Sequence, residues 1–204
     1  MLFLSIIDKI ILIFGIFYSI ILHEIGHGFA AKINGDYTAK EMNRLSLNPL
    51  NHIDLFGTII LPLFLYLMGL PIFGWAKPVP INPLNFYNKR KGMIIVSIAG
   101  VFVNFIIMIL CFFLYSFFKM DSLLAIAGVN IMLFVFNIIP LPPLDGYNLL
   151  INLLPYKFAK IIKSNETTLL IILIILLTTG WIKFIYYPIY KMISIFFIKL
   201  FKFY

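Results

Sequence analysis

The stretch "ILHEIGHGFA", residues 21 to 30, lies at the end of an apolar run that begins near Met1. It carries two of the three histidines of the chain, His23 and His27, with Glu24 between them. On a helix, residues four apart share a face, so both imidazoles can bind one metal ion. Glu24 is the next residue along and can lean toward a water at that ion without binding the ion itself. The stretch therefore predicts a metal site on a helix.

The apolar setting strengthens this interpretation. A glutamate and two imidazoles on an apolar helix are expensive at membrane depth, and ionisable residues there are functional by default. The alternative is a pair of unrelated histidines near a membrane interface, and it leaves that cost unexplained. The setting therefore favours metal binding inside a membrane span.

The composition is that of a membrane protein. The 204 residues are 62% hydrophobic and 12% charged, with a mean hydropathy of +1.04, whereas a soluble domain carries about a quarter charged residues. The net charge is +8, but the basic residues flank apolar runs rather than forming one basic face, so we expect no nucleic-acid partner. Cys111 is the single cysteine, which excludes a disulfide framework and a cysteine-based zinc site.

The apolar runs predict an all-α integral membrane protein with about five to six transmembrane or re-entrant helical segments. No repeat or linker is present, so we expect a single domain over residues 1–204. Between the first and third apolar runs we expect a small irregular or β-hairpin-like insertion, because glycines and prolines interrupt the second run. The C-terminal run 188–204 either crosses the membrane or lies in its interface. The other predicted runs cover residues 3–31, 55–74, 92–118, 123–139 and 167–187.

A catalytic zinc site takes three protein ligands and leaves a fourth position for water, so a third ligand must come from elsewhere. The main candidates are His52, Asp54 and Asp145. Asp54 follows a polar loop, where a solvated carboxylate is ordinary. Asp145 lies in "NIIPLPPLDGYNLL", directly after a predicted span, where prolines free the backbone and Gly146 allows a tight turn. A bare carboxylate there favours a cation, and its alternative role is the N-cap of a short following helix.

The predicted spans also indicate which side of the membrane holds the site. Runs 92–118 and 123–139 form a hairpin, so the residues before the first and after the second lie on one side. If Asp145 shares a metal with the two histidines, the end of the first helix lies there too, and run 55–74 must re-enter or turn back. By the positive-inside tendency this side faces the cytoplasm. It carries ten of the sixteen basic residues: Lys32, Lys40, Arg44, Lys77, Lys89, Arg90, Lys91, Lys157, Lys160 and Lys163.

Several motifs, in this order, resemble the site-2 proteases, which are the intramembrane zinc metalloproteases of peptidase family M50. The compact bacterial and archaeal branch without PDZ or CBS domains is the most similar. The resemblance covers nearly the whole chain, through "HEIGHGFAAKINGD", "RLSLNPLNHIDLFGTIILPL", "GWAKPVPINP", "SIAGVFVNF" and "NIIPLPPLDG". The first motif alone is moderately specific, whereas its combination with the last is strong.

The resemblance implies that His23, His27 and Asp145 bind one Zn²⁺ per chain and that Glu24 is the catalytic residue that activates the water. Where the family writes A-G-P, Val101 replaces the proline. This departure removes no catalytic group, so we expect an active enzyme.

Three further residues match family positions but have two interpretations each. Asn104 and Asn137 bind the substrate backbone or the oxyanion, or they form interhelical hydrogen bonds. His52 is a gating or auxiliary residue, or a hydrogen-bonded loop histidine. The segment "GWAKPVPINP" offers exposed backbone that could hold the substrate as an added strand.

The expected function is hydrolysis of peptide bonds within or next to the transmembrane segments of membrane-anchored proteins, in a cell membrane and with the active site toward the cytoplasm. Two alternatives remain. A membrane metal-ion carrier or transporter would need polar residues spread through the bilayer depth, whereas here they gather at one depth. A catalytically inactive membrane chaperone on the same fold is disfavoured by the presence of Glu24.

Overall fold

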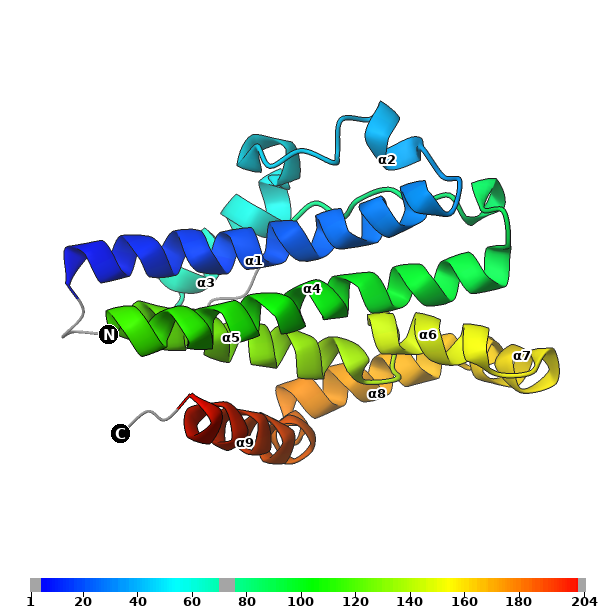
Figure 1. Ribbon diagram of the computed structural model, residues 1–204. Helices are drawn as coiled ribbons and strands as arrows, with labels where there is room; N and C mark the ends of the chain where they lie inside the picture. Colours follow the sequence, from blue (N-terminus) through cyan, green and yellow to red (C-terminus); the bar gives the residue numbers. More distant parts are fainter. Residues whose placement is uncertain (1–4, 70–75, 202–204) are drawn as a thin grey trace.

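The computed structural model describes residues 5–69 and 76–201 (Figure 1). Within these ranges the chain forms helices and turns and contains no strand, which confirms the all-α prediction. The α-helices are α1 (Ile6–Ile33), α2 (Thr38–Glu41), α3 (Leu61–Leu67), α4 (Lys89–Phe118), α5 (Asp121–Ile138), α6 (Asp145–Leu153), α7 (Tyr156–Ser164), α8 (Glu166–Thr178) and α9 (Ile182–Leu200). Shorter helical turns are η1 (Pro49–His52), η2 (Leu55–Ile60) and η3 (Pro83–Asn85).

Among the described residues, three helices are long and apolar enough to cross a membrane: α1, α4 and α5. A fourth candidate is the pair α7 and α8, which bends by 61° between its halves. The predicted run 167–187 is wrong as a single helix, because α8 ends at Thr178 and Gly180 adopts a positive φ of 72° before α9 begins. Only glycine adopts that backbone conformation at little cost, so the chain turns there.

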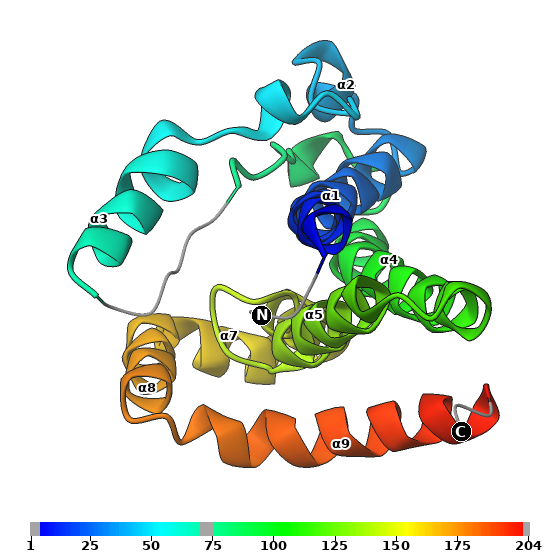
Figure 2. The ribbon, with the colours of Figure 1, turned by 90° about the vertical axis from the view of Figure 1, so that its left-hand side faces the viewer.

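The three long helices form an antiparallel bundle around one core (Figures 1 and 2). Met108 of α4 and Ile131 of α5 are fully buried between them, together with Leu12 of α1. Helix α9 packs across α5, and its Phe197 stacks on Phe112 of α4 with ring centroids 5.2 Å apart. The core therefore fixes the relative positions of the helices that carry the site.

The outer surface of α4 is apolar along its length, as a lipid-facing helix requires. Six large apolar side chains at helical spacing are each at least 45% exposed. A soluble monomer rarely exposes a continuous apolar stripe of this size. Together with the three long apolar helices, this surface marks a membrane protein. The six residues are Ile98, Phe102, Ile106, Leu110, Phe113 and Phe117.

The segment between α1 and α4 leaves the bundle and returns to the same end of it. The amide of Tyr87 donates to the carbonyl of Asn34 over 2.9 Å, so the two ends of the segment meet. The apolar helix within it, Leu55–Leu67, is too short to cross, because thirteen residues span only about 20 Å. The segment is the irregular insertion that the sequence predicts. Its β-hairpin alternative is wrong for the described residues, and the end of the predicted run 55–74 lies outside them.

Candidate metal centre

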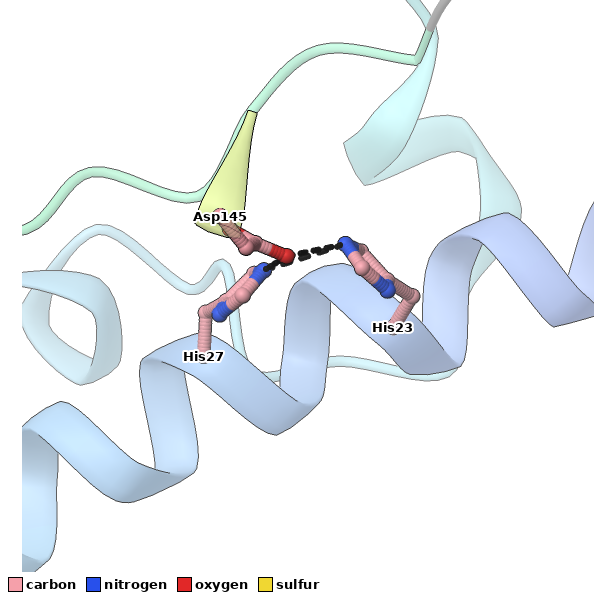
Figure 3. A group of neighbouring side chains, drawn as sticks. All are labelled: His23, His27 and Asp145. Carbon is pink, nitrogen blue, oxygen red and sulfur yellow. Dashed lines mark hydrogen bonds and ion pairs between the residues drawn. The ribbon is translucent and has the colours of Figure 1, made fainter. Parts of the chain in front are cut away.

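The two histidines of α1 and the first residue of α6 meet inside the bundle (Figure 3). The Nε2 atoms of His23 and His27 lie 3.0 Å apart. The Asp145 Oδ2 atom lies 3.4 Å from His23 Nε2 and 3.3 Å from His27 Nε2. Both histidines are buried and the aspartate is largely buried. The sequence-predicted ligand set is therefore one cluster, although Asp145 lies more than a hundred residues from the two histidines in the chain.

The triangle formed by these three atoms has the size that zinc requires. A tetrahedral zinc ion with bonds of about 2.0–2.2 Å places its ligand atoms about 3.3–3.5 Å apart, close to the observed edges. The Asp145 Oδ2 atom is buried and makes no hydrogen bond within the described residues beyond its contacts with the two imidazoles, so a cation at this point would satisfy it. Asp145 is also not the N-cap of α6, because Leu144 takes that position. These observations fit a metal ligand.

The outer nitrogens of the two imidazoles are each held by a neighbour on α4. His27 Nδ1 donates to the carbonyl of Val96 over 2.8 Å, and His23 Nδ1 lies 2.6 Å from Asn104 Oδ1. A carbonyl can only accept, so the proton of His27 is on Nδ1 and its Nε2 lone pair faces the cluster. Such partners orient metal-binding histidines and set their tautomer.

A buried chain of hydrogen bonds sets the orientation of Asn104. The carbonyl of Ile126 accepts from Asn130 Nδ2 over 2.9 Å, and Ser19 Oγ accepts from the same nitrogen over 2.8 Å. The oxygen of Asn130 must then face Asn104 Nδ2, 3.2 Å away, which turns Asn104 Oδ1 toward His23. The backbone of α5 thus determines that His23 carries a proton on Nδ1 and turns its Nε2 toward His27 and Asp145.

Two glycines let the backbone approach the cluster closely. A Cβ at Gly100 would overlap the imidazole of His27 and contact that of His23, and a Cβ at Gly146 would overlap the carbonyl of Ile138. Any larger residue would therefore move α4 away from the histidines, or α6 away from the end of α5. The absence of a side chain at these two glycines therefore allows the helices that carry Asn104 and Asp145 to pack close to the cluster.

Glu24 lies on the side of α1 that faces the proline-rich segment after the second apolar run. Its Oε2 atom accepts a hydrogen bond of 2.9 Å from the backbone N–H of Val79. The side chain is half-buried and is not a member of the three-residue metal cluster. This position, beside the ligands but not among them, suits a residue that exchanges protons with a bound water.

The other candidate residues lie apart from the cluster. His52 is fully buried in the insertion, where its Nε2 is 2.8 Å from the carbonyl of Ser46. Asp54 caps η2 by accepting from the N–H of Gly57 over 2.6 Å. Asn137 donates to the carbonyl of Leu133 in its own helix. The structure therefore brings together His23, His27 and Asp145, with Asn104 behind them.

Comparison with known proteins identifies the family. The sequence is 34% identical over 191 residues to "Putative zinc metalloprotease YwhC" of Bacillus subtilis, covering 87% of this chain and 84% of that relative. It is 30% identical over 178 residues to "Putative zinc metalloprotease Rip2" of Mycolicibacterium smegmatis, covering 83% of this chain and 67% of the relative. The chain belongs to the site-2 protease family.

A more distant relative points the same way. "Zinc metalloprotease MJ0392" of Methanocaldococcus jannaschii is 28% identical over 156 residues, which is 74% of this chain and 36% of that protein. No family model and no solved structure matches the chain. As a site-2 protease the chain is an intramembrane zinc metalloprotease with Zn²⁺ as its cofactor. The ligand atoms of the cluster on α1 and α6 lie close enough together to hold one such ion.

Sequence reasoning missed two parts of this site-2 protease. Asn130 gives no local signal, although an asparagine in the middle of an apolar helix usually hydrogen-bonds across helices. Asp36 is fully buried and accepts hydrogen bonds from the amide of Asn82 (2.7 Å) and the side chain of Asn85 (2.9 Å). The sequence signal that could have found it is an aspartate directly after a glycine at the end of an apolar run. In the structure that glycine, Gly35, has a positive φ of 105° after the end of α1. Asp36 ties the segment that carries Val79 to the helix that carries Glu24.

Proposed function

We propose that this site-2 protease hydrolyses peptide bonds within or next to the transmembrane segments of membrane-anchored proteins. The observation that carries the proposal is the position of the cluster. His23, His27 and Asp145 are buried among helices whose outer surfaces are apolar, so a substrate reaches them from within the membrane or at its surface.

The positions of the residues support the following roles. His23, His27 and Asp145 would hold the zinc ion, and Asn104 is a positioning residue that orients His23. When bound, the ion would make a water molecule more acidic and would polarise the scissile carbonyl. Glu24 accepts the proton of the attacking water and delivers it to the leaving amine.

The segment Lys77–Pro83 is the candidate substrate-holding element. Its amides at Lys77 and Val79 donate to the carbonyl of His52 and to Glu24, and the amide of Asn82 donates to Asp36. Pro78 and Pro80 have no N–H. The Val79 N–H is therefore the donor of this segment that lies beside Glu24. We therefore infer that the substrate enters on the Glu24 side and that a substrate carbonyl replaces Glu24 as the acceptor of the Val79 N–H.

We propose a multi-pass topology with about five to six transmembrane or re-entrant segments: α1, α4 and α5 cross the membrane, η2–α3 and the thirteen-residue α8 enter it without crossing, and α9 runs across the bundle (Figure 2). The end of the bundle with the metal cluster faces the cytoplasm. Support comes from the Tyr87–Asn34 hydrogen bond, which returns the insertion to its starting side, and from the ten basic residues at this end.

Cysteine labelling tests this topology. In a Cys111→Ala background, Gly35→Cys and Asn88→Cys should both react with a membrane-impermeant maleimide from the cytoplasmic face only. Lys119→Cys, at the turn between α4 and α5, should react from the opposite face. Labelling of positions 35 and 88 from different faces would overturn the arrangement.

Cleavage is tested by co-expression with a library of single-span membrane proteins, comparing the wild type with Glu24→Gln. Loss of library members in the presence of the wild type, and not of the variant, is the expected result. A metal carrier would cleave none of them and would change cellular zinc content, whereas an inactive chaperone would leave both unchanged.

A further inference from the structure

A pocket lined by basic side chains lies at the metal-cluster end of the bundle, away from the cluster itself. It is formed by the first turn of α4, the end of α6 and one side of α7, with a volume of about 700 Å³. Lys89, Lys160 and Lys163 line it, and its apolar wall includes Ile151 and Leu154. The pocket therefore combines cationic groups with an apolar surface.

The cationic groups of this pocket are available for a ligand. All three lysines are exposed, and within the described part of the chain none of their ammonium groups has an ion-pair or hydrogen-bond partner. No acidic residue lines the pocket. Arg90 is used differently, because its guanidinium donates to the carbonyls of Asn152 (2.6 Å), Leu153 (2.8 Å) and Leu154 (3.0 Å) at the end of α6. Arg90 therefore stabilises the wall of the pocket, and the three lysines remain able to bind an anion.

Helix α7 has the pattern of a helix that lies in the membrane surface. Lys157, Lys160 and Lys163 recur every three residues and share one face. On the opposite face Phe158 and Ile161 are 56% and 55% exposed, without protein to cover them. An amphipathic helix of this kind lies in the plane of the interface with its apolar face in the acyl region. The 61° bend into the apolar helix α8 is the turn from that plane into the bilayer.

We propose that this pocket binds the headgroup of an anionic phospholipid. The phosphodiester would contact Lys89, Lys160 and Lys163, and the glycerol and upper acyl carbons would lie on Ile151 and Leu154. Charge complementarity favours an anion, and the in-plane helix favours a lipid over a free phosphate, because it holds the pocket at headgroup depth. The lipid would link α4 to α7 at the surface.

The test uses the full-length chain purified in an uncharged detergent. Short-chain phosphatidylglycerol, short-chain phosphatidylcholine, inorganic phosphate and a soluble hexaglutamate peptide are each titrated while the thermal unfolding midpoint is measured. We expect saturable stabilisation by phosphatidylglycerol alone. The triple variant Lys89→Gln, Lys160→Gln, Lys163→Gln should bind it about a hundredfold more weakly, at roughly fivefold for each lysine near the surface.

A matched control removes three charges on α9, in Lys183→Gln, Lys191→Gln, Lys199→Gln, and should keep the wild-type response. Zinc content and the midpoint in phosphatidylcholine show that both variants are folded. Equal stabilisation by inorganic phosphate would overturn the lipid assignment in favour of a free-phosphate site, and a response to hexaglutamate alone would indicate an acidic-peptide site. No response to phosphatidylglycerol, or equal loss in the control variant, would overturn the pocket itself.

Discussion

The two sides of the metal cluster are built differently. Behind His23, a chain of side-chain hydrogen bonds crosses three helices through Asn104 and Asn130, and both asparagines are fully buried. On the opposite side, Glu24 is half-buried and is held by a single backbone N–H of the proline-rich segment. One side is fixed by the packed bundle, whereas the other depends on a segment of the insertion.

This difference separates two requirements of the chemistry. A metal site needs ligands whose rotamers and tautomers are set before the ion binds. A proton acceptor must exchange partners during the reaction, and a substrate must find room beside it. The side behind His23, which we call the packed side, meets the first requirement. The side of Glu24, which we call the adjustable side, meets the second.

The largest expected effect is on the packed side. Asp145→Ala removes one of three ligands, so zinc content should fall from about one per chain to near zero and cleavage should be lost with it. Metal analysis of the purified chain measures this. Asp54→Ala is the matched control, because that aspartate caps η2 and should leave zinc content unchanged. Full zinc in the Asp145 variant would remove this residue from the ligand set.

The next effect lies on the adjustable side. Glu24→Gln keeps the size of the side chain and a hydrogen-bond acceptor for Val79, but it removes the proton acceptor. Zinc content should survive, while the cleavage rate falls about a hundredfold or more. Single-turnover cleavage of a reconstituted substrate, with metal analysis of the same sample, separates the two. A variant that cleaves as fast as the wild type would contradict the proposed mechanism.

A smaller effect tests the hydrogen-bond chain. Asn104→Ala leaves the Nδ1 atom of His23 without its partner, and loss of such a partner typically costs about ten- to a hundredfold in metal affinity or activity. Zinc affinity by chelator competition is the measurement. Asn137→Ala is the control, because the side chain of Asn137 donates to the carbonyl of Leu133 in its own helix and not to a histidine. If Asn137→Ala weakens zinc binding as much as Asn104→Ala, the chain does not orient His23.

The smallest effect concerns Asp36, which anchors the segment Lys77–Pro83 near the end of α1. Burial raises the pKa of Asp36, but hydrogen bonds from Thr38, Asn82 and Asn85 outweigh it and hold the pKa below its usual range. A lowered pKa in the folded state means that the stabilisation is present above the unfolded value of about 3.9 and is lost as the pH falls through the folded value. Asp36→Asn should therefore loosen the segment equally from pH 5 to 8, and the difference from the wild type should shrink below about pH 4.

Amide hydrogen exchange at Val79 and Asn82 measures this loosening, which should be about tenfold or more, because hydrogen bonds to a charged group contribute about 1.5–3 kcal/mol. Asp121→Asn, at the first residue of α5, is the matched control. Unchanged exchange in Asp36→Asn would mean that Val79 is held by Glu24 and not by the anchor.

The long helices and the ligand cluster were predictable from the sequence, because each rests on a strong local signal. Apolar runs of more than twenty residues indicate helices α1 and α4. The i, i+4 spacing places His23 and His27 on one face, and a carboxylate after a predicted span made Asp145 a candidate third ligand, which the family resemblance favoured over His52 and Asp54. The return of the insertion to its starting side also followed, because a shared metal site required it.

The parts that were missed depend on contacts between distant segments. Nothing near Asn104 tells whether its amide faces substrate or His23, because the answer is set by the carbonyl of Ile126 on another helix. The break at Gly180 was missed because apolar residues on both sides continue the run. The absence of strands in the described part of the insertion reflects alternate prolines, which remove the donors that a ladder needs.

The hydrogen bond between Tyr87 and Asn34 has a consequence for how this architecture can diversify. Since the two ends of the insertion are tied together at the bundle, residues can be added or removed between them without moving α1 or α4. Each doubling of a flexible loop costs only about 0.6 kcal/mol of closure entropy. Residues could therefore be added to the loops of the insertion at little cost in stability, without moving the helices that carry the metal cluster.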